Sequence, residues 1–132
     1  MTKSTLPSPD LTSYSSVIWT ESSSYAGVRY GLRRMSLGNR IELTKKVREL
    51  TLQNEFLQAG STTDQLQALL GDLLGRRVYL EWGLSEIQGL AIDGVPATPE
   101  SLIEKGPESL CNEIASAILA SLHLSDEESK NS

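Results

Sequence analysis

"SLGNRIELTKKVRELTLQNEFLQAG", residues 36–60, is the stretch that decides the fold, because it predicts a long helix. Ser36 is a residue type favoured at helix N-caps, and Gly60 stands where a C-terminal glycine is expected. Good helix formers such as Glu, Lys, Arg, Gln and Leu fill the interior. We therefore predict an amphipathic helix over residues 36–59.

The apolar side chains of this helix fall into two stripes rather than one. The first stripe is formed by Leu43, Val47, Leu50 and Leu57. The second, about 130–180° away in helical geometry, is formed by Leu37, Ile41, Leu52, Phe56 and Ala59. A surface helix of a monomer needs only one apolar side. Either the rest of the chain covers both stripes, or one stripe meets another chain.

Before this helix, the sequence predicts a β-hairpin. "YSSVIWT" (14–20) and "GVRYGLRRM" (27–35) flank a polar turn, and Val28, Tyr30 and Leu32 alternate with polar or small residues. A second helix is predicted from about residue 62, with Thr62 or Thr63 as its N-cap. Its buried side is expected to be formed by Leu66, Leu69, Leu70, Leu73 and Leu74. "VYLEW" (78–82) alternates like a strand, but we place it in this helix.

The C-terminal third carries sharp turn and cap signals. In "LAIDGVPA" the pair Asp93-Gly94 predicts a tight type I′ hairpin, and in "TPESL" Thr98 predicts an N-cap with Pro99 at the first helical position. Gly106 ends that short helix. A longer helix follows, with an apolar side predicted to be formed by Leu110, Ile114, Ala117, Ile118 and Leu122. The fold class we expect is α+β, mainly helical.

Length and composition are those of one domain. The chain has 132 residues, enough for a core without disulfides, and its single cysteine excludes an internal disulfide. We divide it into a disordered N-terminal arm (1–13), one globular domain (14–124) and an acidic, polar C-terminal tail (125–132) that we expect to fray. No apolar run is long enough for a membrane span, and the N-terminus lacks the apolar region of a signal peptide. We expect a cytoplasmic protein with no membrane partner.

Charge is segregated along the chain. The net charge is −5, yet seven basic residues and one acidic residue lie between Arg29 and Arg48, whereas ten acidic and two basic residues follow Arg77. The basic segment could face nucleic acid or an acidic partner, or the two halves could face each other within one chain or between copies. Nucleic-acid binding is not favoured, because Glu42, Glu49 and Glu55 interrupt the basic face of the helix and only Tyr30 is available for stacking.

Candidate chemical groups are few. His123, the one histidine, lies near the end of the last predicted helix, where it fits a structural role beside the final carbonyls. Cys111 adjoins Leu110 and reads as a small buried apolar group without second ligands for zinc. No phosphate-binding loop, dinucleotide fingerprint or nucleophile elbow is present. We therefore predict no catalytic residue, no metal site, no cofactor and no enzymatic activity.

Five short segments carry a resemblance to a known family: "RRMSLGNRIEL" (33–43), "WGL" (82–84), "IDGVPAT" (92–98), "GPESL" (106–110) and "KNS" (130–132). In these segments the chain resembles the tail assembly chaperones of bacteriophages and prophages. The resemblance covers roughly residues 27 to 131. It rests on residues that shape turns and helix ends and not on active-site residues, so it assigns no functional role to any single residue. It implies a non-enzymatic protein of the bacterial host cytoplasm. Such a protein would keep the helical tape measure protein soluble and recruit tail tube subunits during tail assembly.

Two classes of function remain open from the sequence. The first is an assembly chaperone; the second is a structural tail component of the virion or a small nucleic-acid-binding regulator. A homo-oligomer is compatible with either. Our candidate partner contacts are the stripe Leu43, Val47, Leu50 and Leu57, or the opposite stripe, with Arg33, Arg34, Lys45, Lys46 and Arg48 as orienting charges.

Overall fold

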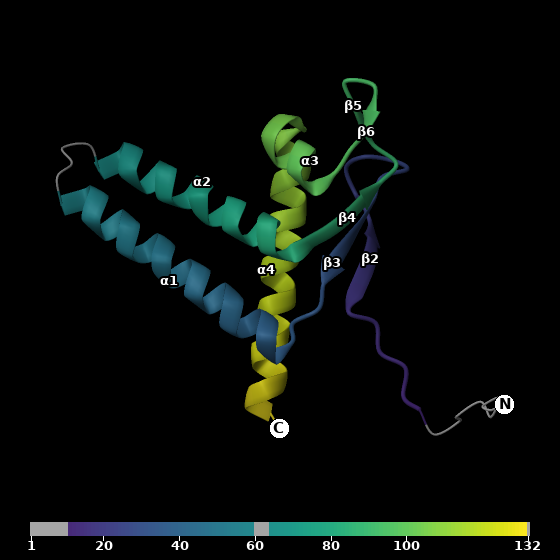
Figure 1. Cartoon of the computed structure of the whole chain (residues 1–132), viewed down its shortest axis with the longest axis horizontal. Coiled ribbons are helices and arrows are strands. Elements are labelled where there is room, and N and C mark those ends of the chain that lie inside the picture. The colour runs from purple at the N-terminus through teal and green to yellow at the C-terminus, as the bar shows by residue number, and fades with distance from the viewer. Residues whose placement is uncertain (1–10, 60–63, 132) are drawn as a thin grey trace, which may run out of the picture.

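Four helices and two small antiparallel sheets make up the part of the chain that the structure describes (Figure 1). The structure is a computed structural model, and it describes the backbone of residues 11–59 and 64–131 and the side chains of residues 11–53 and 68–122. The fold is α+β and mainly helical, as predicted. The predicted N-terminal arm falls largely on residues 1–10, which lie outside the described residues.

The predicted N-terminal hairpin is confirmed. Strand β2 (Val17–Glu21) pairs antiparallel with β3 (Arg29–Arg33). Val28, Tyr30 and Leu32 are buried, so the alternation in the sequence did mark the core-facing side of the strand.

A third strand, β4 (Leu84–Gln88), completes this sheet in the order β2-β3-β4. This strand was not predicted from the sequence. The register passes from Gly31↔Glu86 to Leu32↔Leu84, so one residue of β4 is left over at an irregularity of the ladder. This extra residue lets Leu84 and Ile87, three positions apart, both face the core. A strand with that spacing does not show the alternation by which strands are recognised.

Helices α1 (Leu37–Ala59) and α2 (Asp64–Gly83) form an antiparallel hairpin that extends away from the sheet (Figure 1). The Ser36 hydroxyl accepts a hydrogen bond from the Asn39 N–H at 3.1 Å, which confirms the predicted N-cap. "VYLEW" is helical, as predicted. The predicted caps at Gly60, Thr62 and Thr63 lie outside the described residues.

The signals around Asp93-Gly94 and Thr98 are confirmed. Asp93 (φ 52°) and Gly94 (φ 79°) form the turn between β5 (Ala91–Ile92) and β6 (Val95–Pro96). Helix α3 (Pro99–Lys105) begins with a capping box in which Thr98 and Ser101 satisfy each other's backbone N–H groups. These short-range patterns determine their own local structure, so the sequence was sufficient to predict them.

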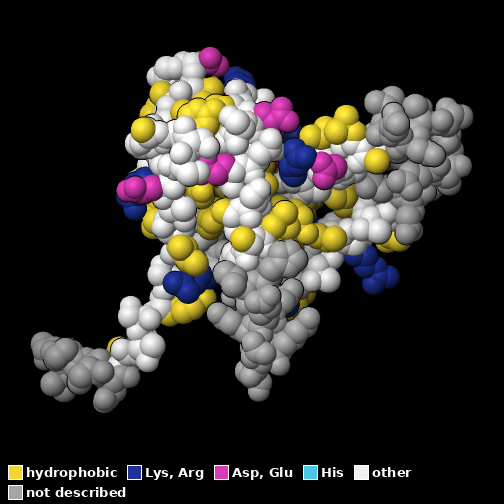
Figure 2. All heavy atoms as spheres, turned by 180° about the vertical axis from the view of Figure 1, so that it is seen from behind, with side chains coloured by type: hydrophobic (Ala, Val, Ile, Leu, Met, Phe, Trp, Pro, Cys, Tyr) yellow, Lys and Arg dark blue, Asp and Glu magenta, His cyan; other side chains and the backbone are white. Residues whose placement is uncertain are grey.

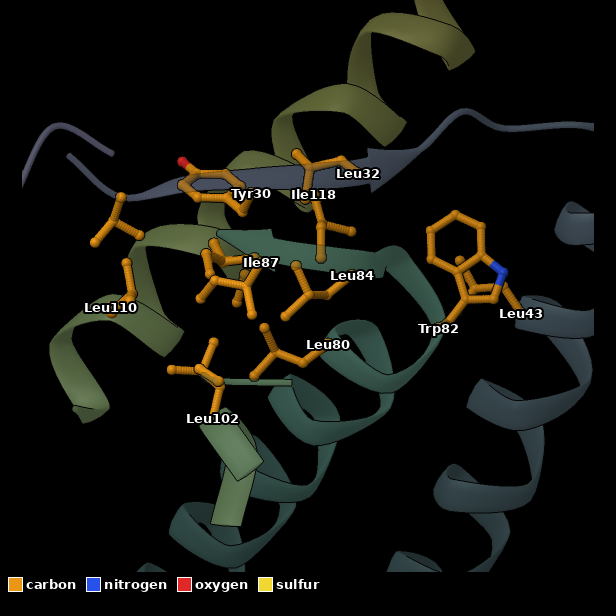
Figure 3. Close-up of a cluster of buried hydrophobic side chains, with 14 residues drawn as sticks. Tyr30, Leu32, Leu43, Leu80, Trp82, Leu84, Ile87, Leu102, Leu110 and Ile118 are labelled. Atoms are coloured by element: carbon orange, nitrogen blue, oxygen red, sulfur yellow. The ribbon is translucent and has the colours of Figure 1, made fainter. Parts of the chain in front are cut away.

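Helix α4 (Glu108–Asn131) packs one side against the sheet and α2. Its backbone is helical through the segment that was predicted to be a frayed tail, so the helix is longer than expected. The largest fully buried side chains are Leu102 on α3 and Leu110 and Ile114 on α4. Figure 3 shows how the sheet, α2, α3 and α4 converge on this core.

The predicted buried side of α2 is only partly correct. Leu69, Leu70 and Leu73 are exposed, whereas Leu74 is half-buried; the side chain of Leu66 lies outside the described residues. The reason is geometric. The distal part of α2 lies in the extending hairpin, beyond the ends of α3 and α4 that cover its proximal part (Figure 1).

Candidate partner-binding surface

The first apolar stripe of α1, which begins at Leu43, is part of the core. Leu43 is 7% exposed and lies against Trp82 of α2 (Figure 3). Val47 packs against the same cluster, and Leu50 is half-buried. Leu57 lies outside the residues whose side chains are described. Leu43 is therefore a core residue, and our expectation that it contacts a partner is withdrawn because its side chain is already covered by α2.

The opposite stripe of α1 is uncovered. Leu37 is 78% exposed, Ile41 50% and Leu52 54%, while Phe56 and Ala59 lie outside the described side chains. The structure thus distinguishes the two stripes that the sequence left equivalent. The described part of the chain covers the first stripe and leaves the second in solvent.

Helix α2 carries an apolar stripe that begins in the core and continues into solvent. Leu69, Leu73 and Leu80 lie within about 40° of one another around the helix, given 3.6 residues per turn. Leu80 is buried among α3 and α4, whereas Leu69 remains 53% exposed. The same side of one helix is therefore interior at one end and surface at the other.

A groove of about 360 Å³ lies where this stripe leaves the core. Its apolar lining is provided by Leu73, Leu74, Leu80, Ile103 and Cys111. Arg76 and Arg77 stand at its rim, where their charges are engaged by Asp72 and by Glu81 and Glu104. Figure 2 shows apolar side chains exposed on the extending hairpin beside the hollow that separates it from the rest of the domain.

The five basic residues predicted to orient a partner do not form one patch. Lys45 and Arg48 are exposed on α1. Lys46 and Arg33 line an adjoining polar cleft of about 650 Å³ together with Glu81, Glu100 and Glu104. Arg34 stacks its guanidinium over the Tyr14 ring at 5.3 Å. The cleft brings side chains from the basic and the acidic parts of the chain together, so some of the segregated charge is balanced within the molecule.

Glu113 of α4 holds the turn between β2 and β3. Its carboxylate accepts hydrogen bonds from the Tyr30 hydroxyl at 2.9 Å, the Ser22 hydroxyl at 3.0 Å and the Ser23 and Ser24 N–H groups at 3.2 and 3.3 Å. Burial acts to raise the pKa of Glu113, but these donors outweigh it and the pKa is lowered. Burial and the neighbouring carboxylate raise the pKa of Tyr30 to about 12. Each of these hydrogen bonds joins α4 to the β2–β3 hairpin, so we assign this cluster a structural role.

Cys111 has the environment of a structural thiol. It is half-buried, and its Sγ lies 3.6 Å from the Leu102 carbonyl oxygen. Burial, with a contribution from Glu108, raises the pKa of the thiol, which disfavours the nucleophilic thiolate. His123 lies outside the residues whose side chains are described. Among those that are described, no group of His, Cys, Asp and Glu side chains is arranged to hold a metal ion.

Comparison with known proteins yields no relative: no protein-family model, curated protein or solved structure matches the chain significantly. Within the described residues, none of the helices combines the length and apolar composition needed to cross a bilayer. The function is therefore inferred from the exposed surface of the protein. The sequence predicted a partner-binding surface on α1 but not the one on α2, because the periodicity of the α2 leucines predicted that they are buried.

Proposed function

We propose that this protein is a non-enzymatic binding protein that holds an apolar helical segment of a partner along the α1–α2 hairpin. The specific role that we propose is that of a phage tail assembly chaperone acting on the tape measure protein in the host cytoplasm. The observation that carries the proposal is the stripe of α2, which runs from buried Leu80 to exposed Leu69 through an apolar groove. A partner helix lying there would extend the core of the domain.

The energetics of the surface support a helical client. Covering the exposed parts of Leu69, Leu70 and Leu73 gains roughly 1 kcal/mol for each side chain at about 25 cal/mol per Å² of apolar surface. Contiguous exposed apolar side chains beside a groove are typical of protein-binding sites. A tape measure protein has long apolar helical stripes before tail assembly, so it has the chemistry that this surface fits.

The test is coexpression with the tape measure protein of the phage or prophage that encodes the chain. We expect a soluble complex on size-exclusion chromatography with the wild-type protein. Leu69→Glu combined with Leu73→Glu should abolish the complex and leave the circular dichroism spectrum unchanged, because both side chains are exposed. Val95→Glu is the control, since Val95 is also an exposed apolar residue but lies on the separate β5–β6 hairpin. A complex that survives the double substitution would refute the proposed surface.

Two further measurements separate the other candidate roles. A chaperone should be absent from purified virions, whereas a structural tail component should be present in them. A nucleic-acid-binding regulator should shift DNA in a manner that weakens steeply with salt, and binding of that kind would contradict the proposal.

A further inference from the structure

The outer side of α1 carries positive charge in the middle of its apolar stripe. Helical geometry places Lys45 and Arg48 on the same side as Ile41 and Leu52, and all four are exposed. We call Leu37, Ile41, Lys45, Arg48 and Leu52 the mixed stripe. With a rise of about 1.5 Å per residue, it is about 23 Å long.

Among the described residues, the two central charges of the mixed stripe have no ion-pair partner. Lys45 and Arg48 form no ion pair with the described residues, whereas Arg76 and Arg77 on α2 are engaged by Asp72, Glu81 and Glu104. The nearest acidic residues on α1, Glu42 and Glu49, lie on one flank of the stripe rather than within it. The stripe therefore presents two cations, unpaired within the described part of the chain, between two apolar ends.

We propose that the mixed stripe docks an amphipathic helix of a second protein, with carboxylates at the centre of its contacting face and apolar side chains at both ends. The carboxylates would meet Lys45 and Arg48, and the apolar ends would cover Leu52 and the Leu37–Ile41 pair. This interaction goes beyond the proposed function, because it uses another helix and another side of the hairpin. Leu43 and Trp82 pack between the helices (Figure 3), so the mixed stripe and the α2 stripe face away from each other.

The pattern of charge favours a protein helix over a membrane or a nucleic acid. A helix that lies in a bilayer keeps its charges off the apolar face, whereas here Lys45 and Arg48 occupy the centre of that face. A partner helix can place one carboxylate opposite each cation, which is the arrangement that a stripe with apolar ends and a charged centre requires.

The experiment selects partners by chemistry. A displayed library of helical peptides, about 18 residues long so that it spans the stripe, is varied at one face among Leu, Glu, Lys and Ser and selected on the full-length protein. We expect the recovered peptides to carry glutamate at the centre and leucine at the ends. Their affinity should fall about tenfold or more in Lys45→Glu combined with Arg48→Glu, because attraction becomes repulsion.

Charge reversal and a matched control make the test specific. The doubly reversed protein should bind peptides in which the central glutamates are replaced by lysine. Lys105→Glu, which reverses an exposed cation on α3 away from the hairpin, should change affinity by less than about twofold. Leu69→Glu with Leu73→Glu should leave peptide binding intact, so failure of this proposal and failure of the proposed function give different results.

Any of four outcomes would overturn the proposal. They are recovery of no binding peptide, recovery of peptides without an acidic centre, binding that survives reversal of Lys45 and Arg48, and occupation of the stripe by something else. The last is checked directly. Sedimentation would reveal a self-associated form that the reversal dissolves, and flotation with phosphatidylserine vesicles would reveal a membrane-bound form.

Discussion

At the scale of single residues, Glu113 stabilises the contact between α4 and the turn of the N-terminal hairpin. Its carboxylate accepts hydrogen bonds from Tyr30 and from the serine turn at residues 22–24. Because the pKa of Glu113 is lowered in the folded state, its contribution to stability is present above the ordinary carboxyl pKa. That contribution is lost as the pH falls through the lowered value. Tyr30, whose pKa is raised to about 12, contributes below pH 10 and loses its contribution as the pH rises through 12.

We therefore predict that Glu113→Gln lowers the free energy of unfolding by about 1–2 kcal/mol at pH 7, since hydrogen bonds to a charged acceptor are weakened. The difference from wild type should shrink as the pH falls through the lowered pKa of Glu113, because the wild-type carboxylate then becomes protonated as well. Urea denaturation followed by circular dichroism, at pH 7 and at a series of lower pH values, measures it.

The control for this prediction is Glu86→Gln. Glu86 is exposed on β4 and its side chain makes no hydrogen bond to the described residues, so its substitution should change stability by less than about 0.5 kcal/mol at any of these pH values. A loss for Glu113→Gln that stays constant across the whole pH series would show that the charge of the carboxylate does not matter.

At the scale of the elements, the two apolar stripes of α1 should differ sharply in their effect on stability. Leu43→Ala removes a buried side chain that packs on Trp82, and we predict a loss of about 2–4 kcal/mol in the free energy of unfolding. Leu52→Ala, on the exposed stripe, should change it by less than about 0.5 kcal/mol. Denaturation of the two variants under the same conditions compares them. Equal losses would mean that the stripe containing Leu52 is also covered in solution.

The same helix shows what could and could not be predicted from the sequence. Both stripes of α1 were visible, but choosing the core stripe requires knowing where Trp82 of α2 lies, and this is a long-range contact. The turn at Asp93-Gly94 and the cap at Thr98 were predicted correctly because each is determined within a few residues. Strand β4 was missed because its irregular register spaces Leu84 and Ile87 by three positions.

At the scale of the whole molecule, the domain has a well-packed end and an exposed end. The core joins the sheet, α3, α4 and the proximal part of α2, whereas the distal hairpin carries Leu52, Leu69 and Leu73 in solvent. The exposed apolar side chains of both proposed partner surfaces lie on the α1–α2 hairpin. The sequence indicated excess apolar surface on α1, but the extension of α2 beyond its neighbours depends on how the helices pack and was not predicted.

This arrangement predicts a gradient of local stability along α2. Backbone amides near Leu80 and Trp82 should exchange with solvent only through global unfolding, because both side chains are buried in the core. Amides between Leu69 and Leu73 should exchange on the order of 100-fold faster through local opening, since little apolar surface holds that part of the hairpin. Hydrogen exchange followed by NMR measures both regions in one sample. If a client binds the α2 stripe, its addition should slow the distal amides toward the proximal rate while leaving the proximal amides nearly unchanged. Uniform exchange along α2 in the free protein would show that the hairpin is as stable as the core and would remove the physical reason for expecting a client there.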